Sequence, residues 1–222
     1  MLATYLKQAI RRLAKDRQST FLNLAGLATG LACAVLIYLW TSDERSVDKF
    51  NDKDGRLYLV IKNSPRADGS IFTSYVTPGM LADAMKTDLP EVEDAVSVRT
   101  EDGPGVLTYN GKSLKARQEF ADTDFFRMFS YRLLDGNKAK PLAGNYGVLI
   151  SDKLALAMFN TTENLIGKTV TWDQNGEFDG SYVISGVFQA PPANATDQFD
   201  LLLSYDLYKT KEGGATGDVN NW

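Results

Sequence analysis

Side chains that could bind a metal ion are concentrated in one stretch, DERSVDKFNDKD, at residues 43–54. Its carboxylates and amide offer the oxygen ligands that Ca²⁺ prefers in proteins. The stretch lacks the loop glycine and the spacing of an EF-hand, so a solvated turn is the better interpretation. Pairs of carboxylates that could serve a glycosidase are plentiful elsewhere, but nothing in the sequence singles out one pair.

Composition argues against most other kinds of catalysis. The chain has no histidine and so lacks the usual general base, the usual partner of a serine or cysteine nucleophile and the commonest nitrogen ligand of zinc. The single cysteine, Cys33, rules out an internal disulfide and a Cys-only metal site. There is no GxxxxGK[ST] phosphate-binding loop, and the net charge of −4 disfavours nucleic acid. We therefore expect no catalytic residue, cofactor, metal or nucleic-acid partner.

The element that precedes the polar stretch is an uncharged run of 20 residues, FLNLAGLATGLACAVLIYLW, at residues 21–40. A helix of this length spans roughly 30 Å, the thickness of the hydrocarbon core of a bilayer. A cleaved signal peptide and a buried soluble helix are the alternatives. A signal peptide has a shorter apolar region, of about 7 to 15 residues, and ends in small residues rather than LIYLW. We predict a retained transmembrane helix at residues 19–41.

The charges that flank this run predict its orientation. Basic residues dominate before it and acids are frequent after it, so the positive-inside rule places residues 1–18 in the cytoplasm and the chain after residue 41 outside. Residues 2–15 have the periodicity of an amphipathic helix, which could lie on the inner membrane surface or contact a cytoplasmic partner. The charged residues concerned are Lys7, Arg11, Arg12, Lys15 and Arg17 before the run, with Asp16, and Asp43, Glu44, Arg45, Asp48 and Lys49 after it.

Two features of the predicted helix suggest contacts. Gly26, Gly30 and Ala34 form a stripe of small residues that would let a second helix approach closely, although such residues are also common in membrane helices generally. No proline or glycine follows Trp40 until Gly55. We therefore expect the helix to continue beyond the membrane surface to about Phe50 as a stiff stalk. The residues assigned to this exit are Asp43, Glu44, Asp48 and Phe50.

The remainder, residues 42–222, alternates strands with short helices and predicts one α+β domain with a mixed sheet and hairpins. Asn110-Gly111 between two extended arms predicts a hairpin over residues 106–117. Ser151 is expected to cap a helix that follows a strand within residues 147–159. Further strands are expected at residues 56–62, within VEDAVSVRT, and at KTVTW and SYVISGVFQ. Further helices are expected at residues 77–90 and 121–136, and the tail from residue 209 is expected to be a loop.

An aromatic group lies within the helix expected at residues 121–136. Phe125, Phe126 and Phe129 are assigned as anchors of the domain core, because aromatic side chains dominate ordinary protein interiors. A ligand pocket lined by these rings is the alternative.

Several motifs, taken in order, resemble those of MacB/FtsX-type ABC transporter permeases. The apolar run is followed by Asp43-Glu44, Asp48-Lys49-Phe50 and Arg56-Leu57-Tyr58. PEVEDAVSV, ADTDFFRMFSYRLLDG, VLISDKLALAMF, IGKTV and YVISGVFQAPPANATDQFD then resemble the MacB-like periplasmic core domain, and the set covers nearly the whole chain. One departure is Asn160, where a glycine usually follows the helix.

The resemblance implies that the chain is the N-terminal portion of a permease subunit in a bacterial inner membrane, with its periplasmic domain truncated at the C-terminal end. ATP would be hydrolysed by a separate cytoplasmic ABC ATPase, and a second permease copy would complete a dimer. A periplasmic adaptor protein is a further candidate partner. Such permeases transmit motion through the first membrane helix to the periplasmic domain, for export or extraction of a substrate. The alternative is a single-pass membrane-anchored sensor or binding module, and an anchored enzyme ranks third.

Overall fold

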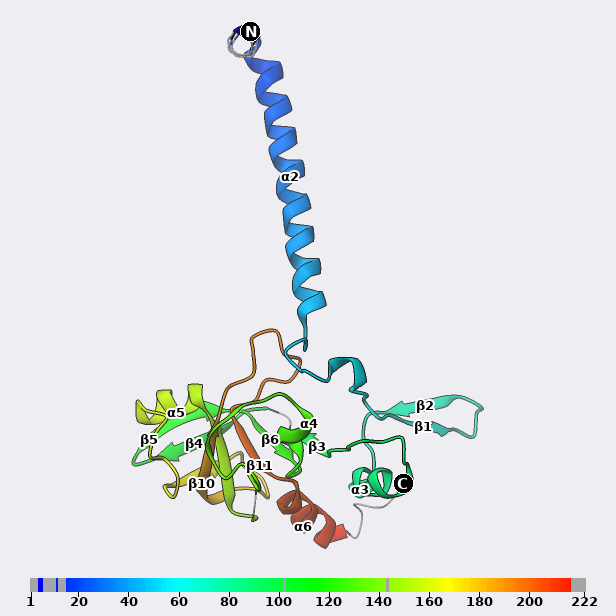
Figure 1. Cartoon of the computed structure of the whole chain (residues 1–222), viewed down its shortest axis with the longest axis vertical. Helices are drawn as coiled ribbons and strands as arrows, with labels where there is room; N and C mark the ends of the chain where they lie inside the picture. Colours follow the sequence, from blue (N-terminus) through cyan, green and yellow to red (C-terminus); the bar gives the residue numbers. More distant parts are fainter. Residues whose placement is uncertain (1–3, 6–10, 12–14, 102, 143, 217–222) are drawn as a thin grey trace. The chain divides into compact units, whose positions relative to one another are not determined.

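The computed structural model of the chain describes residues 4, 5, 11, 15–101, 103–142 and 144–216 (Figure 1). The chain divides into two compact units, Met1–Val47 and Asp48–Trp222. Most of the amphipathic helix expected at residues 2–15 lies outside the described residues, as does the end of the tail.

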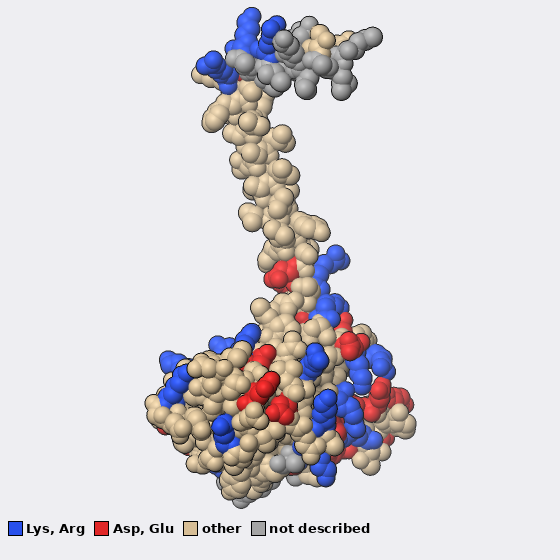
Figure 2. Space-filling view, turned by 60° about the vertical axis from the view of Figure 1, so that its left-hand side comes forward, with Lys and Arg blue, Asp and Glu red and all other residues tan. Residues whose placement is uncertain are grey.

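The first unit contains helix α2, Arg17–Ser46, which includes the uncharged run. Asp16 caps its start by accepting a hydrogen bond from the N–H of Ser19 at 3.4 Å. None of its residues is buried, and its surface carries no charge along the middle of the helix (Figure 2). Within the described part of the chain, α2 is the one helix long and apolar enough to cross a membrane.

The expected continuation of this helix to Phe50 is wrong. The helix ends at Ser46, Val47 has an extended backbone with ψ 130°, and Asp48 is left-handed with φ 57°. A left-handed residue without glycine's freedom is uncommon and persists where side-chain contacts hold it. Asp48 has such contacts with Thr196 and Asn194.

The second unit is built on a nine-stranded mixed sheet with the order β3-β6-β11-β8-β10-β9-β4-β5, and with β7 also pairing β10. Strands β6 and β11 are parallel, as are β8 and β10, and all other pairs are antiparallel. The strands are β3 Val98–Thr100, β4 Gly105–Tyr109, β5 Lys112–Ala116, β6 Gln118–Ala121, β7 Leu133–Gly136, β8 Gly147–Ser151, β9 Thr169–Asp173, β10 Gly180–Phe188 and β11 Leu201–Ser204. A separate hairpin pairs β1 Lys62–Pro65 with β2 Ile71–Ser74. The predicted α+β class is confirmed.

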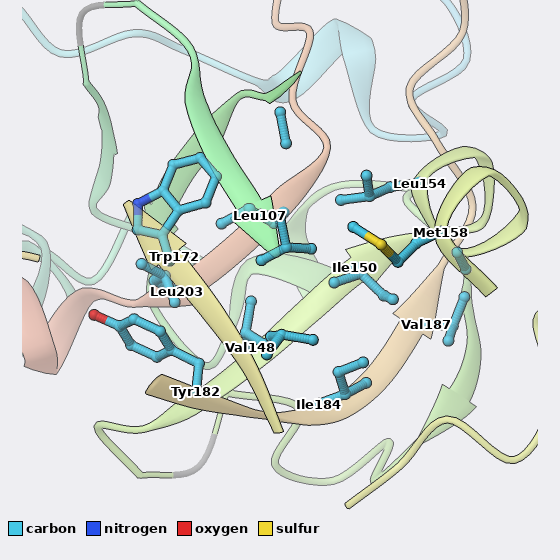
Figure 3. Packing of buried hydrophobic residues seen from close by; sticks show 14 of the residues in the cluster. Leu107, Val148, Ile150, Leu154, Met158, Trp172, Tyr182, Ile184, Val187 and Leu203 are labelled. Atoms are coloured by element: carbon cyan, nitrogen blue, oxygen red, sulfur yellow. The ribbon is translucent and has the colours of Figure 1, made fainter. Parts of the chain in front are cut away.

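Both faces of the central strands are buried. Leu201 and Leu203 of β11 belong to one apolar cluster, whereas Leu202 between them belongs to the other. Successive residues of a strand point to opposite faces, so a strand covered on both faces is apolar throughout. Figure 3 shows the larger cluster, which lies between the sheet and helix α5, Asp152–Phe159.

Local sequence signals explain the parts of the domain that were predicted well. Asn110 and Gly111 have φ values of 47° and 79°, the pair of positive angles that a tight hairpin turn requires, and they join β4 to β5. Ser151 caps α5, its Oγ accepting a hydrogen bond from the N–H of Leu154 at 3.1 Å. Asn160 ends α5 in the left-handed conformation, so it takes the role that glycine usually has there.

Two expected elements near the start of the domain are wrong in extent. Residues 57–61 are not in a strand, and the side chains of Tyr58 and Leu59 are 80% and 74% exposed. Strand propensity needs a partner strand, and none of the described strands runs beside them. Helix α3 spans Leu81–Asp88 and starts after a turn in which the N–H of Leu81 donates to the carbonyl of Pro78.

Three later expectations also need correction. The strand expected within VEDAVSVRT is confined to β3. Of residues 121–136 only Phe125–Met128, helix α4, is helical, because Leu133–Gly136 pairs with β10 as β7. The tail expected to be a loop begins as helix α6, Tyr205–Thr216.

Candidate functional site at residues 48–52

Residues 48–52, called the docked segment below, follow α2 in the chain and bind the domain. The carboxylate of Asp48 accepts hydrogen bonds from the N–H of Thr196 at 2.9 Å and from its Oγ1 at 2.6 Å. The N–H of Asp48 donates to the carbonyl of Asn194 at 3.4 Å. The first residue of the domain is therefore held by the connection between β10 and β11.

A second set of hydrogen bonds holds the other end of the docked segment. The side chain of Asn51 is buried, and its Oδ1 accepts from the N–H of Ser130 at 3.1 Å. The N–H of Asp52 donates to Ser130 Oγ at 2.9 Å. Nδ2 of Asn51 donates to the carbonyl of Asp48 at 3.2 Å and so closes the turn that the segment forms. One amide side chain thus joins the segment to itself and to the domain.

Between these two anchors the docked segment packs against an aromatic cluster. The rings of Phe50 and Tyr131 have their centroids 5.1 Å apart, and Tyr131 stacks on Phe125 at 5.3 Å with an interplanar angle of 5°. Phe199 meets both Tyr131 and Phe125 edge-on. Offset-stacked and edge-to-face pairs are the favoured arrangements of aromatic rings. The ring of Phe50 is therefore linked by direct contacts to the fully buried ring of Phe125.

The connection that receives Asp48 is itself held in place. The N–H of Ala195 donates to the carbonyl of Pro192 at 3.0 Å, and the amide of Gln198 donates to the same carbonyl at 2.7 Å. At its end, Asp200 accepts from the N–H of Arg117 at 2.9 Å. A loop with internal hydrogen bonds of this kind gives Thr196 a defined position for binding Asp48.

Acidic groups surround this site. Burial, and then the charge of Asp197, raises the pKa of Glu119 on β6 to about 8. Partial burial, and then the charge of Asp48, raises the pKa of Asp197. Burial raises the pKa of Tyr131 well above its ordinary value, and the charges of Glu119, Asp197 and Asp48 add to this effect. Acidic side chains from three segments therefore lie close enough to affect protonation at this site.

The described residues can be compared with the needs of a metal site. No group of three or more Asp, Glu or Cys among them could hold a metal ion. Two surface hollows, of about 230 and 550 Å³, lie near Lys153 and near Tyr109. The charged and polar side chains that line them are at least partly exposed.

The residues predicted as helix and exit sites fall into two groups. Gly26, Gly30 and Ala34 lie exposed on α2, and apart from neighbouring residues and the backbone of the helix itself nothing lies within 4 Å of a Cβ built on either glycine. Asp43 and Glu44 lie exposed in the last turns of α2. Asp48 and Phe50, assigned to the same stalk, lie outside the helix and belong to the docked segment. They contact the domain rather than continue a stalk.

The three phenylalanines assigned as core anchors lie together in the smaller apolar cluster. Phe125 is 2% exposed, whereas Phe126 and Phe129 are partly buried and pack against it. Sequence patterns did not identify five residues of this site: Asn51, Ser130, Tyr131, Thr196 and the buried Glu119. No local pattern marks these residues, because Ser130 and Thr196 are 79 and 148 positions away from their partners in the docked segment.

Among the described residues, one apolar helix of membrane-spanning length is followed by a mixed α+β domain, which defines a class of protein with a candidate membrane anchor and a folded domain beyond it. The sequence matches the family model described as MacB-like periplasmic core domain over residues 20–220. The chain therefore belongs to this family, which consists of periplasmic domains of MacB-like and FtsX-like ABC transporter permeases. No curated protein matches the sequence.

Solved structures align with the chain to different extents. A domain of a predicted permease protein from Porphyromonas gingivalis aligns with a TM-score of 0.57 and 24% identity over 73% of this chain. The chain spans 65% of the length of that domain. The extracellular domain of the noncanonic ABC-type transporter YknZ from Gram-positive bacteria aligns with a TM-score of 0.47 and 16% identity, covering 62% of this chain and 67% of its own. The periplasmic region of MacB from Actinobacillus actinomycetemcomitans aligns at 0.43 and 19%, covering 59% and 57% respectively.

Proposed function

We propose that this chain is the N-terminal part of a permease subunit of an ABC transporter, and that it passes motion from its membrane helix to its periplasmic domain. Residues 19–41 cross the inner membrane once, with residues 1–18 in the cytoplasm and the domain from residue 42 outside. Family membership and the basic residues before the helix support this arrangement. A separate cytoplasmic ATPase and a second permease copy complete the machine, and Gly26, Gly30 and Ala34 are its candidate helix-packing surface.

The observation that carries the proposal is the anchoring of the docked segment. Motion of a helix reaches a domain only through a connection that does not absorb it. Helix α2 ends at Ser46, and Asp48 is hydrogen-bonded to the domain two residues later. The free connection is therefore about one residue long. We propose that transmission depends on this short connection and on the anchors of Asp48 and Asn51, rather than on a continuous helical stalk.

A coupling experiment tests the proposal. The full-length permease is purified with the ATPase that accompanies it, and hydrogen exchange of the domain is compared with and without ATP. We expect nucleotide-dependent exchange in the wild type. Replacing Ser46 and Val47 by Gly-Pro should remove that response while ATP hydrolysis continues. An unchanged response in this variant would show that the connection does not transmit motion, and failure of any ATPase to co-purify would argue against the transporter assignment.

Orientation is tested separately. In a Cys33→Ala background, a membrane-impermeant maleimide added to spheroplasts should label Asp68→Cys and spare Lys15→Cys until the membrane is permeabilised. The reverse labelling pattern would place the domain in the cytoplasm.

A further inference from the structure

The buried carboxyl group of Glu119 lies on the face of the sheet that receives the docked segment. Glu119 is 2% exposed. Its side chain is on the same face of β6 as that of Ala121, and Leu202 lies opposite it on the neighbouring strand β11. Ala121 and Leu202 both belong to the smaller apolar cluster, against which Tyr131 packs. A titratable group therefore lies on the face of the sheet that carries this cluster, near Tyr131, whose ring contacts Phe50.

No described residue compensates a charge at this position. Among the described residues none donates a hydrogen bond to the Glu119 carboxyl group or forms an ion pair with it. On the neighbouring strand β3, Thr100 is its register partner, and Arg99 pairs with Glu101 and lies over the ring of Tyr208. Arg99 is the register partner of Phe120 and so belongs to the opposite face.

The other titratable groups near Glu119 come from the docked segment and from the two segments that bind it, and the contacts among these three are called the attachment. Asp197, whose charge acts on Glu119, lies beside Thr196 in the connection between β10 and β11. Asp48, whose charge acts on Asp197, lies in the docked segment itself. Tyr131 comes from the segment after α4, and the charge of Glu119 acts on its hydroxyl group. An ionised Glu119 would therefore repel the carboxylate of Asp197, which is next to Thr196, the residue that donates hydrogen bonds to Asp48.

We propose that Glu119 acts as a pH-sensitive release for the docked segment. With its proton, the neutral carboxyl group lets the aromatic cluster close around Tyr131 and Phe50. When it loses that proton to solvent, the buried charge is stabilised by admitting water to the cluster, which loosens the contacts of residues 48–52. Because burial and Asp197 raise the pKa of Glu119 to about 8, this change falls in a pH range that an extracytoplasmic domain can meet. The inference deepens the proposed function, since it concerns regulation of the same attachment.

The expected size of the effect follows from proton linkage. In the released state water reaches Glu119, and its pKa returns toward the ordinary value of 4.5. A group whose pKa falls from about 8 to about 4.5 on release favours release as the pH rises. Between pH 6 and pH 8 the equilibrium constant for release should then rise by up to about 50-fold, and from pH 7 to pH 9 by about 10-fold.

Hydrogen exchange of the full chain in detergent micelles measures this release without ATP, substrate or ATPase. The reporters are the backbone N–H groups of Asp52, Ser130 and Thr196, which donate hydrogen bonds across the attachment. After correction for the intrinsic rate, their protection should fall with pH in the wild type and stay constant in Glu119→Gln. Glu163→Gln, which alters an exposed carboxylate in the segment between α5 and β9, should behave as the wild type.

Three results would overturn the inference. They are constant protection in the wild type from pH 6 to pH 9, a wild-type pH response in Glu119→Gln, and a pH response lost equally in Glu163→Gln. A ¹³C NMR titration of the Glu119 carboxyl group in the wild type provides a test that needs no variant, and a midpoint near 4.5 would also contradict the inference. Since neither measurement involves transport, their failure would leave the coupling proposal to its own experiment.

Discussion

The amide side chain of Asn51 makes the sharpest prediction about the attachment. Asn51→Ala removes two hydrogen bonds, one to the N–H of Ser130 and one to the carbonyl of Asp48. A typical hydrogen bond contributes about 1 kcal/mol to stability, and a buried group left without a partner costs about 1 to 3 kcal/mol. Asn51 is 7% exposed, so water does not readily replace its side chain. We expect the free energy of unfolding to fall by about 2 kcal/mol.

Asn63→Ala provides the matched control. Asn63 is exposed, and its Oδ1 accepts a hydrogen bond from Thr73 Oγ1 at 2.8 Å, which water can replace. Its loss should cost less than about 0.5 kcal/mol, as for most surface substitutions. Both variants are compared with the wild type by urea unfolding of the full chain in a nonionic detergent, followed by near-UV circular dichroism.

Comparing the two variants tests whether the side chain of Asn51 holds the docked segment on the domain. Asn51→Ala should also lower the hydrogen-exchange protection of the Ser130 amide, which Asn63→Ala should leave unchanged. Equal stability of the two variants, or full protection of Ser130 in Asn51→Ala, would refute the view that this amide holds the docked segment on the domain.

Two further predictions concern the smaller apolar cluster. Phe125→Ala should destabilise the domain by about 3 to 5 kcal/mol, because it empties a site that is 2% exposed. Phe126→Ala, at a partly exposed site, should cost clearly less. Equal losses of stability in urea unfolding would contradict the assignment of Phe125 as the central ring. The raised pKa of Glu119 means that the folded state keeps a proton that the unfolded state releases. The contribution of Glu119 to stability should therefore be greatest below about pH 4.5 and fall by up to about 1.4 kcal/mol per pH unit until about pH 8. Glu119→Gln should remove this component, and an identical pH dependence of stability in the two proteins would disprove it.

The elements with strong local signals were predictable. The hairpin at Asn110-Gly111 follows from two residues that tolerate positive φ, and the start of α5 follows from Ser151 as a hydroxyl cap. The elements that failed are those whose conformation depends on distant partners. Residues 57–61 have strand-forming side chains but no described partner strand, and Leu133–Gly136 is a strand because β10 lies beside it. At that contact, Gly186 approaches β7 so closely that a Cβ would lie 2.5 Å from the carbonyl oxygen of Asp135.

The docked segment shows the same difference between local sequence signals and contacts with distant residues. Asp48 and Phe50 were selected from the sequence, but as parts of a stalk, because a stretch without proline or glycine is compatible with a helix. Hydrogen bonds from Thr196 and a ring contact with Tyr131 stabilise a different conformation. The competing contacts come from residues far away in the chain, so no local pattern could reveal them.

The sequence by itself determined the apolar helix, the α+β class and the family, because each depends on local composition or on motifs in a fixed order. Only the tertiary structure decided where that helix ends and what the next residues do. Asp48 and Asn51 meet Thr196 and Ser130 because the sheet brings the β10–β11 connection and the segment after α4 to one face. The burial of Glu119 is likewise a tertiary property, since a carboxylate in a short strand becomes buried only when both faces of that strand are covered.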